Sequence, residues 1–303
     1  MTSPALDREL SSDASDPVGL DGIEFIEYAT PRPQALGQVL ETMGFRPIAR
    51  HRSREVTLYR QGEMNIVVNA SEPAPVDGEG EREDAPRIAA IALRVRDAAA
   101  AYRHVLALGA WAVPTHVEVM ELNIPAIHGV GGSRIYFVDR HREFSIYDVD
   151  FTAIPTVEPK PPALADMHWF GIVQYIGNDR MQDWTAFYSM LFGFTVLPDD
   201  QRFGVMPKGR VLVGPGGPRR RFYVQLIEPE PGILDAKGTE WIARLGLGAP
   251  DPRACVALLR ERGVAFTETS HVHSDERGAV TCTQLGSVVF ELVRDDRQKD
   301  TQS

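Results

Sequence analysis

The chain has 303 residues, which at roughly 150 residues per domain predicts two domains. Apolar residues make up 43% of the chain and charged residues 24%, a composition typical of globular proteins with buried cores. The 32 Lys and Arg against 42 Asp and Glu give a formal charge of −10, which argues against binding to nucleic acid or to a membrane. Cys255 and Cys282 are too few for a disulfide framework and favour a cytoplasmic location.

Polar segments flank the predicted core at both ends. Residues 1–20 are rich in acids and serines and lack the apolar stretch of a signal peptide. We expect these residues, and residues 296–303, to be disordered tails. No run of about 18 apolar residues occurs, so the sequence predicts no transmembrane helix.

The first half predicts a sheet with two helices. Apolar residues alternate over residues 22–30, and the spacing becomes helical over residues 33–45, where Gly44 is typical of a helix end. The other elements predicted in this half are strands at 55–61, 64–70 and 87–95, a helix at 97–110 capped by Asp97, and strands at 135–140 and 144–151.

The second half repeats this order. Its predicted elements are a strand at 171–177, a helix at 181–194, strands at 210–214, 222–228 and 241–247, a helix at 251–264 capped by Asp251, and strands at 279–285 and 288–294. The Pro-rich residues 154–166 are typical of a semi-rigid linker. We therefore predict an α+β fold of two tandem modules of βαβββ repeats, at residues 21–153 and 167–295. Each module should form an eight-stranded curved sheet whose concave face is free to enclose a small molecule.

Several segments resemble the 4-hydroxyphenylpyruvate dioxygenases of the vicinal oxygen chelate superfamily. They are GIEFIEYATP, LETMGF, VMELNIPAIHGVGGSRIYFVDR and SIYDVDF in the first half, and DRMQDWTAFYSMLFGF and GSVVFELV in the second. The resemblance runs from about Gly22 to Arg294. It implies two tandem glyoxalase/dioxygenase-like modules, with the chemistry in the second module and none of the metal in the first. Members of this family oligomerise, so a homodimer is possible.

The resemblance also implies an iron site, from which this sequence departs. In the family, Fe(II) is held by a His on the opening strand of the second module, a His on its fifth strand and a Glu on its last strand. Glu291 matches the Glu, but Gly171 and Arg244 stand where the two His are expected. His168 lies three residues before Gly171 and could serve as a ligand only if the strand is shifted. We therefore interpret the triad as degraded and expect no cofactor, with His168 and Glu291 as Fe(II) ligands in the alternative.

Without iron, the same positions suggest a different site. Gln225 matches a ligand position of related glyoxalase modules, so Gln225, Arg244 and Glu291 should project into one cavity. A guanidinium beside a carboxylate can pair with it and can also receive an anionic oxygen of a substrate. We assign catalytic roles to Glu291 and Arg244 and substrate contacts to Gln225 and to Gln174 or Tyr175, depending on which of the last two faces inward. The alternative to a catalytic role is a salt bridge that only occupies the position of a lost metal site.

Three functions remain open. The first is an enzyme that acts on a small aromatic or 2-oxoacid-type substrate by proton transfer without metal. The second is an active Fe(II)-dependent dioxygenase, and the third is a non-catalytic protein that binds small molecules or confers resistance. The family continues after the Glu strand into a helix that caps the cavity, whereas the twelve residues after Glu291 are polar. We therefore expect a more open cavity, or one covered by a partner subunit.

Overall fold

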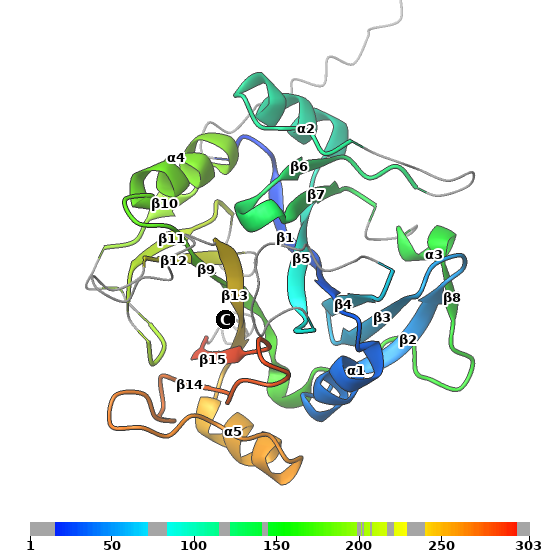
Figure 1. Cartoon of the computed structure of the whole chain (residues 1–303), viewed down its shortest axis with the longest axis vertical. Helices are drawn as coiled ribbons and strands as arrows, with labels where there is room; N and C mark the ends of the chain where they lie inside the picture. Colours follow the sequence, from blue (N-terminus) through cyan, green and yellow to red (C-terminus); the bar gives the residue numbers. More distant parts are fainter. Residues whose placement is uncertain are drawn as a thin grey trace, which may run out of the picture.

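The computed structural model describes residues 16–71, 84–114, 122–140, 145–198, 201, 203–206, 208–216, 221–228 and 240–295. These residues form two curved sheets that lie next to each other, with α2 and α4 at one end of the molecule and α1 and α5 at the other (Figure 1). The predicted α+β fold of tandem modules is confirmed. Within the described part of the chain, no helix is long and apolar enough to cross a membrane.

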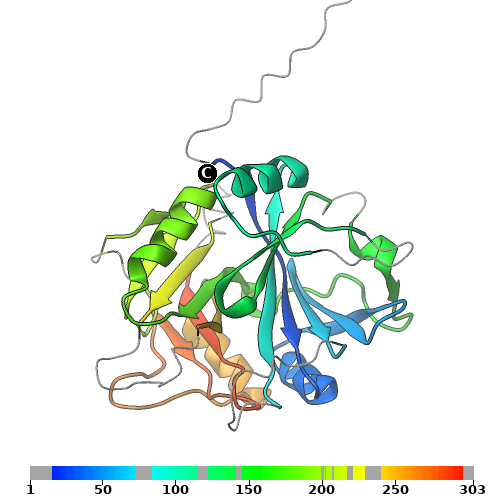
Figure 2. The same cartoon turned by 45° about the horizontal axis from the view of Figure 1, so that its top comes forward.

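The first module contains an eight-stranded sheet in the order β6-β7-β5-β1-β4-β3-β2-β8. Its strands are β1 (Leu20–Ala29), β2 (Arg46–His51), β3 (Val56–Gln61), β4 (Met64–Asn69), β5 (Arg87–Val95), β6 (Ala126–His128), β7 (Arg134–Val138) and β8 (Phe151–Ala153). Its helices are α1 (Pro33–Thr42), α2 (Ala98–Ala107), the single turn α3 (Tyr147–Asp150) and the short 3₁₀ turn η1 (Val130–Gly132). Figure 2 shows α1 and α2 at opposite ends of this sheet.

The second module contains a sheet of seven strands in the order β10-β11-β12-β9-β13-β15-β14. Its strands are β9 (His168–Tyr175), β10 (Thr195–Val196), β11 (Arg210–Val213), β12 (Tyr223–Ile227), β13 (Trp241–Ala249), β14 (Gly278–Val280) and β15 (Phe290–Arg294). The helices are α4 (Met181–Phe192) and α5 (Pro252–Glu261), and the 3₁₀ turn η2 (Leu164–Asp166) precedes β9. The expectation of eight strands in this module is wrong for the described residues.

One predicted strand of the first module is also wrong. Within residues 144–151, the structure has the helical turn α3 followed by the start of the short strand β8. The turn forms because the Asp148 carboxylate accepts hydrogen bonds from the Ser145 backbone N–H at 2.8 Å and from its hydroxyl at 3.1 Å. Such a local side-chain bond favours a helix start over an extended strand.

The two modules can be matched residue by residue through a bulge that they share. In the first module, Glu27 pairs with Ala90 and Tyr28 with Ile88, so one residue of β5 is skipped. In the second module, Val173 pairs with Arg244 and Gln174 with Ile242, so β13 skips a residue at the same place. Carried along the strands, this register puts Phe25, Ala90 and Tyr136 where the second module has Gly171, Arg244 and Glu291.

A shared core and polar contacts join the modules. One cluster of buried side chains contains residues of both sheets, and Phe137 of β7 stacks on Phe192 of α4 with ring centroids 6.3 Å apart. After α5, the Arg262 guanidinium donates hydrogen bonds to the Glu41 and Thr42 carbonyls at the end of α1, at 2.7 and 2.8 Å. A cation at this helix end satisfies carbonyls that lack partners within the helix.

The N-cap of α5 gives the first testable prediction. The Asp251 carboxylate accepts a hydrogen bond from the Ala254 backbone N–H at 3.0 Å. Asp251→Ala should lower the free energy of unfolding by about 1 kcal/mol, because this N–H loses its partner. Asp251→Asn should retain nearly all of the stability, since Asn is an equally good cap. Urea unfolding followed by circular dichroism checks both values, and an Ala variant as stable as the wild type would contradict the prediction.

Candidate active site

Arg244 and Glu291 form an ion pair inside the second module. Arg244 comes from β13 and Glu291 from the adjacent parallel strand β15, and the register places both side chains on the concave face. Arg244 Nε lies 3.3 Å from Glu291 Oε2, and each side chain is only 6% exposed. Nη2 of Arg244 is also buried, and it has no hydrogen-bond partner among the described residues. The guanidinium therefore has N–H groups available for an additional acceptor.

Burial controls the protonation of Glu291. Loss of water around the carboxylate raises the pKa of Glu291, and the nearby Arg244 charge and the Val205 backbone N–H only partly oppose this effect. A carboxyl group with a raised pKa can take up and release a proton closer to neutral pH than an exposed one. The pair thus combines a proton acceptor with a fixed cation.

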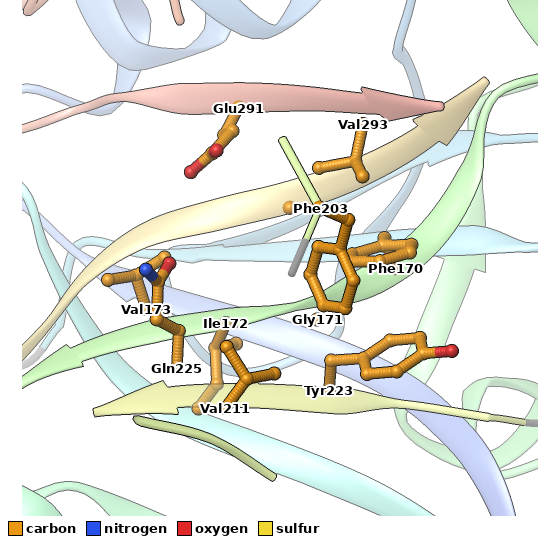
Figure 3. Close-up of a pocket in the computed structure, with 11 residues that line it drawn as sticks. Phe170, Gly171, Ile172, Val173, Phe203, Val211, Tyr223, Gln225, Glu291 and Val293 are labelled. Atoms are coloured by element: carbon orange, nitrogen blue, oxygen red, sulfur yellow. The ribbon is translucent and has the colours of Figure 1, made fainter. Parts of the chain in front are cut away.

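A short segment closes the pocket beside this pair. We call residues 203–206, between β10 and β11, the plug. The ring of Phe203 packs edge-on against Phe170 and Tyr223, with centroids 4.7 and 4.8 Å away (Figure 3). A Cβ at Gly204, whose φ is +74°, would lie 2.7 Å from Glu291 Oε1, so a glycine allows the plug to approach the carboxylate. The remaining pocket, about 20 Å³, is large enough for a single water molecule.

The predicted polar residues of the cavity divide between the two faces of the sheet. Gln225 lines the pocket together with Glu291, and its amide donates hydrogen bonds to the Met206 and Lys208 carbonyls at 2.9 and 2.6 Å. Gln174 lies on the opposite face, where its Oε1 accepts a hydrogen bond from the Tyr188 hydroxyl of α4 at 2.8 Å. The expectation that Gln174 lines the cavity is therefore wrong.

Tyr175 occupies a strand position whose side chain is expected on the concave face of the sheet. It follows Gln174 along β9 and so shares the face of Val173 and Gln225. Its ring lies edge-on to Trp241 at 5.1 Å, at the far end of the strand from Glu291. A role for Tyr175 in substrate binding stays a prediction.

His168 is held away from the pair. Its Nε2 lies 3.1 Å from Asp295 Oδ2, and its Nδ1 lies 3.1 Å from the Asp166 carbonyl oxygen. His168 pairs across the sheet with Gly248, whereas Glu291 pairs with Gly246, which lies two residues earlier in β13. Both ring nitrogens of His168 thus have partners at the edge of the module.

The residues present do not fit the iron site that the resemblance implies. Of its three positions, only Glu291 offers a donor, and the cation of Arg244 is already beside this carboxylate. A Cβ at Gly171 would lie 2.2 Å from the Tyr223 carbonyl oxygen, so this backbone has no room for a His. Among the described residues, no group of three or more His, Cys, Asp or Glu is placed to hold a metal.

The plug is the part of the site that sequence reasoning missed. Phe203 lines the pocket and the Val205 backbone N–H bonds to Glu291, but the segment around them shows neither the alternation of a strand nor the spacing of a helix. The expectation of a more open cavity is therefore wrong for the described residues, and a cover supplied by a partner subunit stays a prediction. The aromatic ring of Phe203 was the one available signal, since a large apolar side chain in a loop must pack somewhere.

The crowding at Gly171 gives the second prediction. Gly171→Ala should lower the free energy of unfolding by about 1–3 kcal/mol, because the added methyl group overlaps the Tyr223 carbonyl. Gly246→Ala is the matched control on the neighbouring strand, where the nearest atom would be 3.3 Å away, and it should cost less. Chemical unfolding measures both, and equal losses would contradict the reported geometry.

The pKa of Glu291 gives the third prediction. A raised pKa means that the folded state holds the proton more tightly than the unfolded chain. The stability that Glu291 contributes should therefore fall as the pH rises above the ordinary Glu pKa of about 4.3. The free energy of unfolding of the wild type minus that of Glu291→Gln should decrease over this window.

Urea unfolding between pH 4 and 8 measures that difference. Glu63→Gln, which removes a carboxylate on a side chain that is 91% exposed, is the control for the loss of one negative charge. A difference that increases with pH would mean that attraction to Arg244 outweighs burial.

Comparison with known proteins agrees with this architecture. The family model for the N-terminal domain of hydroxyphenylpyruvate dioxygenase matches residues 14–152. The structure is similar to a fusion protein of a xylose isomerase-like TIM barrel and 4-hydroxyphenylpyruvate dioxygenase, with a TM-score of 0.70, 23% identity, and coverage of 91% of this chain and 49% of the other. It is also similar to a mutant of 4-hydroxymandelate synthase from Streptomyces coelicolor, with a TM-score of 0.69, 18% identity, and coverage of 92% and 93%. At these identities the two structures support the fold alone.

Curated sequences give the family. The chain is 42% identical over 182 residues to 4-hydroxyphenylpyruvate dioxygenase of Pseudomonas sp. (strain P.J. 874), covering 59% of this chain and 50% of the relative. It is 34% identical over 279 residues to Hemolysin VllY of Vibrio vulnificus, with coverage of 87% and 76%. It is 32% identical over 273 residues to 4-hydroxyphenylpyruvate dioxygenase of Pseudomonas aeruginosa, with coverage of 86% and 75%. The chain thus spans half to three quarters of these relatives, and it belongs to the 4-hydroxyphenylpyruvate dioxygenase family of vicinal oxygen chelate proteins.

Proposed function

We propose that this chain is an enzyme that catalyses proton transfer on a small 2-oxoacid, aromatic in the simplest case, at Arg244 and Glu291 and without iron. The observation that carries the proposal is the buried ion pair, in which a carboxyl group of raised pKa lies beside a guanidinium with unpaired N–H groups. The substrate class is taken from relatives named 4-hydroxyphenylpyruvate dioxygenase, since 4-hydroxyphenylpyruvate is an aromatic 2-oxoacid.

The proposed chemistry uses only these two side chains. Arg244 donates a hydrogen bond from Nη2 to the 2-oxo oxygen of the substrate, while its Nε stays beside Glu291. Glu291 removes a proton from the adjacent carbon, and the electron pair of that C–H bond moves to the oxygen to form an enolate. The guanidinium stabilises the negative charge where it develops. Return of the proton from Glu291 to the carbon or to the oxygen releases the keto or the enol form.

The plug must move for this substrate to bind. A pocket of about 20 Å³ cannot hold an aromatic acid, and Phe203 occupies the space beside Glu291 (Figure 3). Movement of the plug would break the hydrogen bond from Gln225 to Met206 and free that N–H of the amide for the substrate. In this order of events, Gln225 contacts the substrate only after the plug has moved.

The closed pocket also favours a second candidate, a non-catalytic protein that binds small molecules. If the plug stays in place, no substrate reaches Glu291, and the pair only fills the former metal position. Solvent exchange separates the two candidates, because a binding protein does not exchange substrate protons.

The fourth prediction is exchange of deuterium into the substrate. Protein in deuterium oxide should exchange the protons next to the 2-oxo group of 4-hydroxyphenylpyruvate faster than buffer does, as followed by proton NMR. Glu291→Gln should slow this exchange about 10²–10⁴-fold, the range of general-base catalysis. Glu63→Gln, an exposed change in the other module, should leave the rate unchanged.

Chelators decide the role of metal in the same assay. The rate should be the same with and without a strong iron chelator. Exchange that requires added Fe(II), or oxygen consumption that Fe(II) supports, would overturn the proposal in favour of an iron-dependent dioxygenase. Substrate binding without any exchange would favour the binding protein.

A further inference from the structure

We propose that the first module carries a second small-molecule site, on its own concave face, for a hydroxylated aromatic compound such as a phenol. The cavity there measures about 350 Å³, against about 20 Å³ in the second module. Pockets that bind small ligands typically measure about 300–1,000 Å³. Of these two cavities, the larger thus lies in the module to which the family resemblance gives no metal.

A buried polar cluster lies at one end of this cavity. Oε1 of Glu27 accepts hydrogen bonds from Asn69 Nδ2 at 2.8 Å and from Arg134 Nη2 at 3.1 Å. Glu27 is 6% exposed and Asn69 is 8% exposed, and all three side chains line the cavity. A charged side chain buried at this depth is costly unless it is paired, and the pairing here retains a polar surface toward the cavity.

The two charged side chains of this cluster meet over a small residue, Ala90. Ala90 lies between Glu27 and Arg134 in the sheet, so the two charged side chains reach across it to meet. The matching residue of the second module is Arg244, which fills the corresponding position with a guanidinium. In the first module Glu27 and Arg134 thus meet over Ala90, where the second module has the Arg244 side chain, and the cavity lies beside this pair.

The cluster suits a hydroxyl group. Carboxylate oxygens accept hydrogen bonds, and the guanidinium and amide groups donate them, so the cluster offers both functions side by side. A hydroxyl both donates and accepts, whereas a carboxylate ligand would face Glu27 and an ammonium ligand would face Arg134.

The charges of the described residues that line the cavity favour an uncharged ligand. Among the described residues that line it, Arg54 and Arg134 balance Glu27 and Asp150, and His51 is neutral in its unprotonated form. No excess charge of either sign selects an ion. This balance distinguishes a phenol from an aromatic acid.

The remaining walls suit an aromatic ring. Phe25 and Tyr136 line the cavity with ring centroids 5.9 Å apart, and the Arg134 guanidinium lies 5.7 Å from the centre of the Tyr136 ring. Val56 and Val67 of the neighbouring strands add apolar surface. A planar ring can pack against these groups while its hydroxyl reaches the polar cluster.

Calorimetric titration of the full chain with phenol and catechol tests this site. We expect saturable binding, with benzoate and toluene each binding at least tenfold more weakly. Glu27→Gln removes the charged acceptor, so phenol affinity should fall about tenfold or more, while benzoate should gain because the Arg134 charge is no longer balanced. Arg134→Lys should weaken phenol binding as well, since it removes the planar donor beside Tyr136.

Two controls keep the result interpretable. Circular dichroism and a cooperative unfolding transition show whether each variant is folded, and ring-current shifts of a fluorinated phenol in ¹⁹F NMR report binding independently. Glu291→Gln should bind phenol as the wild type does, and Glu27→Gln should keep the exchange activity of the second module, so this proposal and the proposed function can fail separately.

Two results would overturn the proposal. One is the absence of saturable phenol or catechol binding to the wild type in both methods. The other is phenol binding that is lost with Glu291→Gln but kept by folded Glu27→Gln and Arg134→Lys, which would place the ligand in the second module.

Discussion

The burial of Arg244 beside Glu291 is the constraint on which the second module depends. Removing two charges from water is costly, and their attraction offsets this cost only when they remain together. Loss of either partner would leave the other charge uncompensated in a position that is 6% exposed. Nη2 of this guanidinium lacks an acceptor among the described residues, and the proposed role of the pair in substrate binding rests on this nitrogen.

Close backbone packing surrounds this pair and closes the pocket. At Gly171 the strand β9 approaches the Tyr223 carbonyl so closely that no side chain fits, and at Gly204 the plug approaches the Glu291 carboxylate. The two glycines thus have different effects on the site. Gly171 leaves no side chain at this position of β9, and Gly204 allows the loop backbone, through the Val205 N–H, to contact the carboxylate.

Much of the fold could be predicted from the sequence, because its elements have strong local signals. The apolar residues of β5 and the caps Asp97 and Asp251 appear where the pattern predicts them. The strand β2 (Arg46–His51) was missed because polar residues and a Pro interrupt its alternation. The pairing of Arg244 with Glu291 could be predicted by counting along strands, whereas the positions of Gln174 and the plug depend on bulges and loop packing that no periodicity records.

The core shared by the two modules links their thermodynamics. Phe137 stacks on Phe192, and Arg262 donates hydrogen bonds to the end of α1. Because of these contacts, unfolding of one sheet would expose buried side chains of the other. The chain should therefore unfold as one cooperative unit, in which free energy gained in one half is distributed over both. A molecule held on the concave face of one sheet would then protect the backbone amides of the other against hydrogen exchange through global unfolding, with no contact between ligand and distant strand.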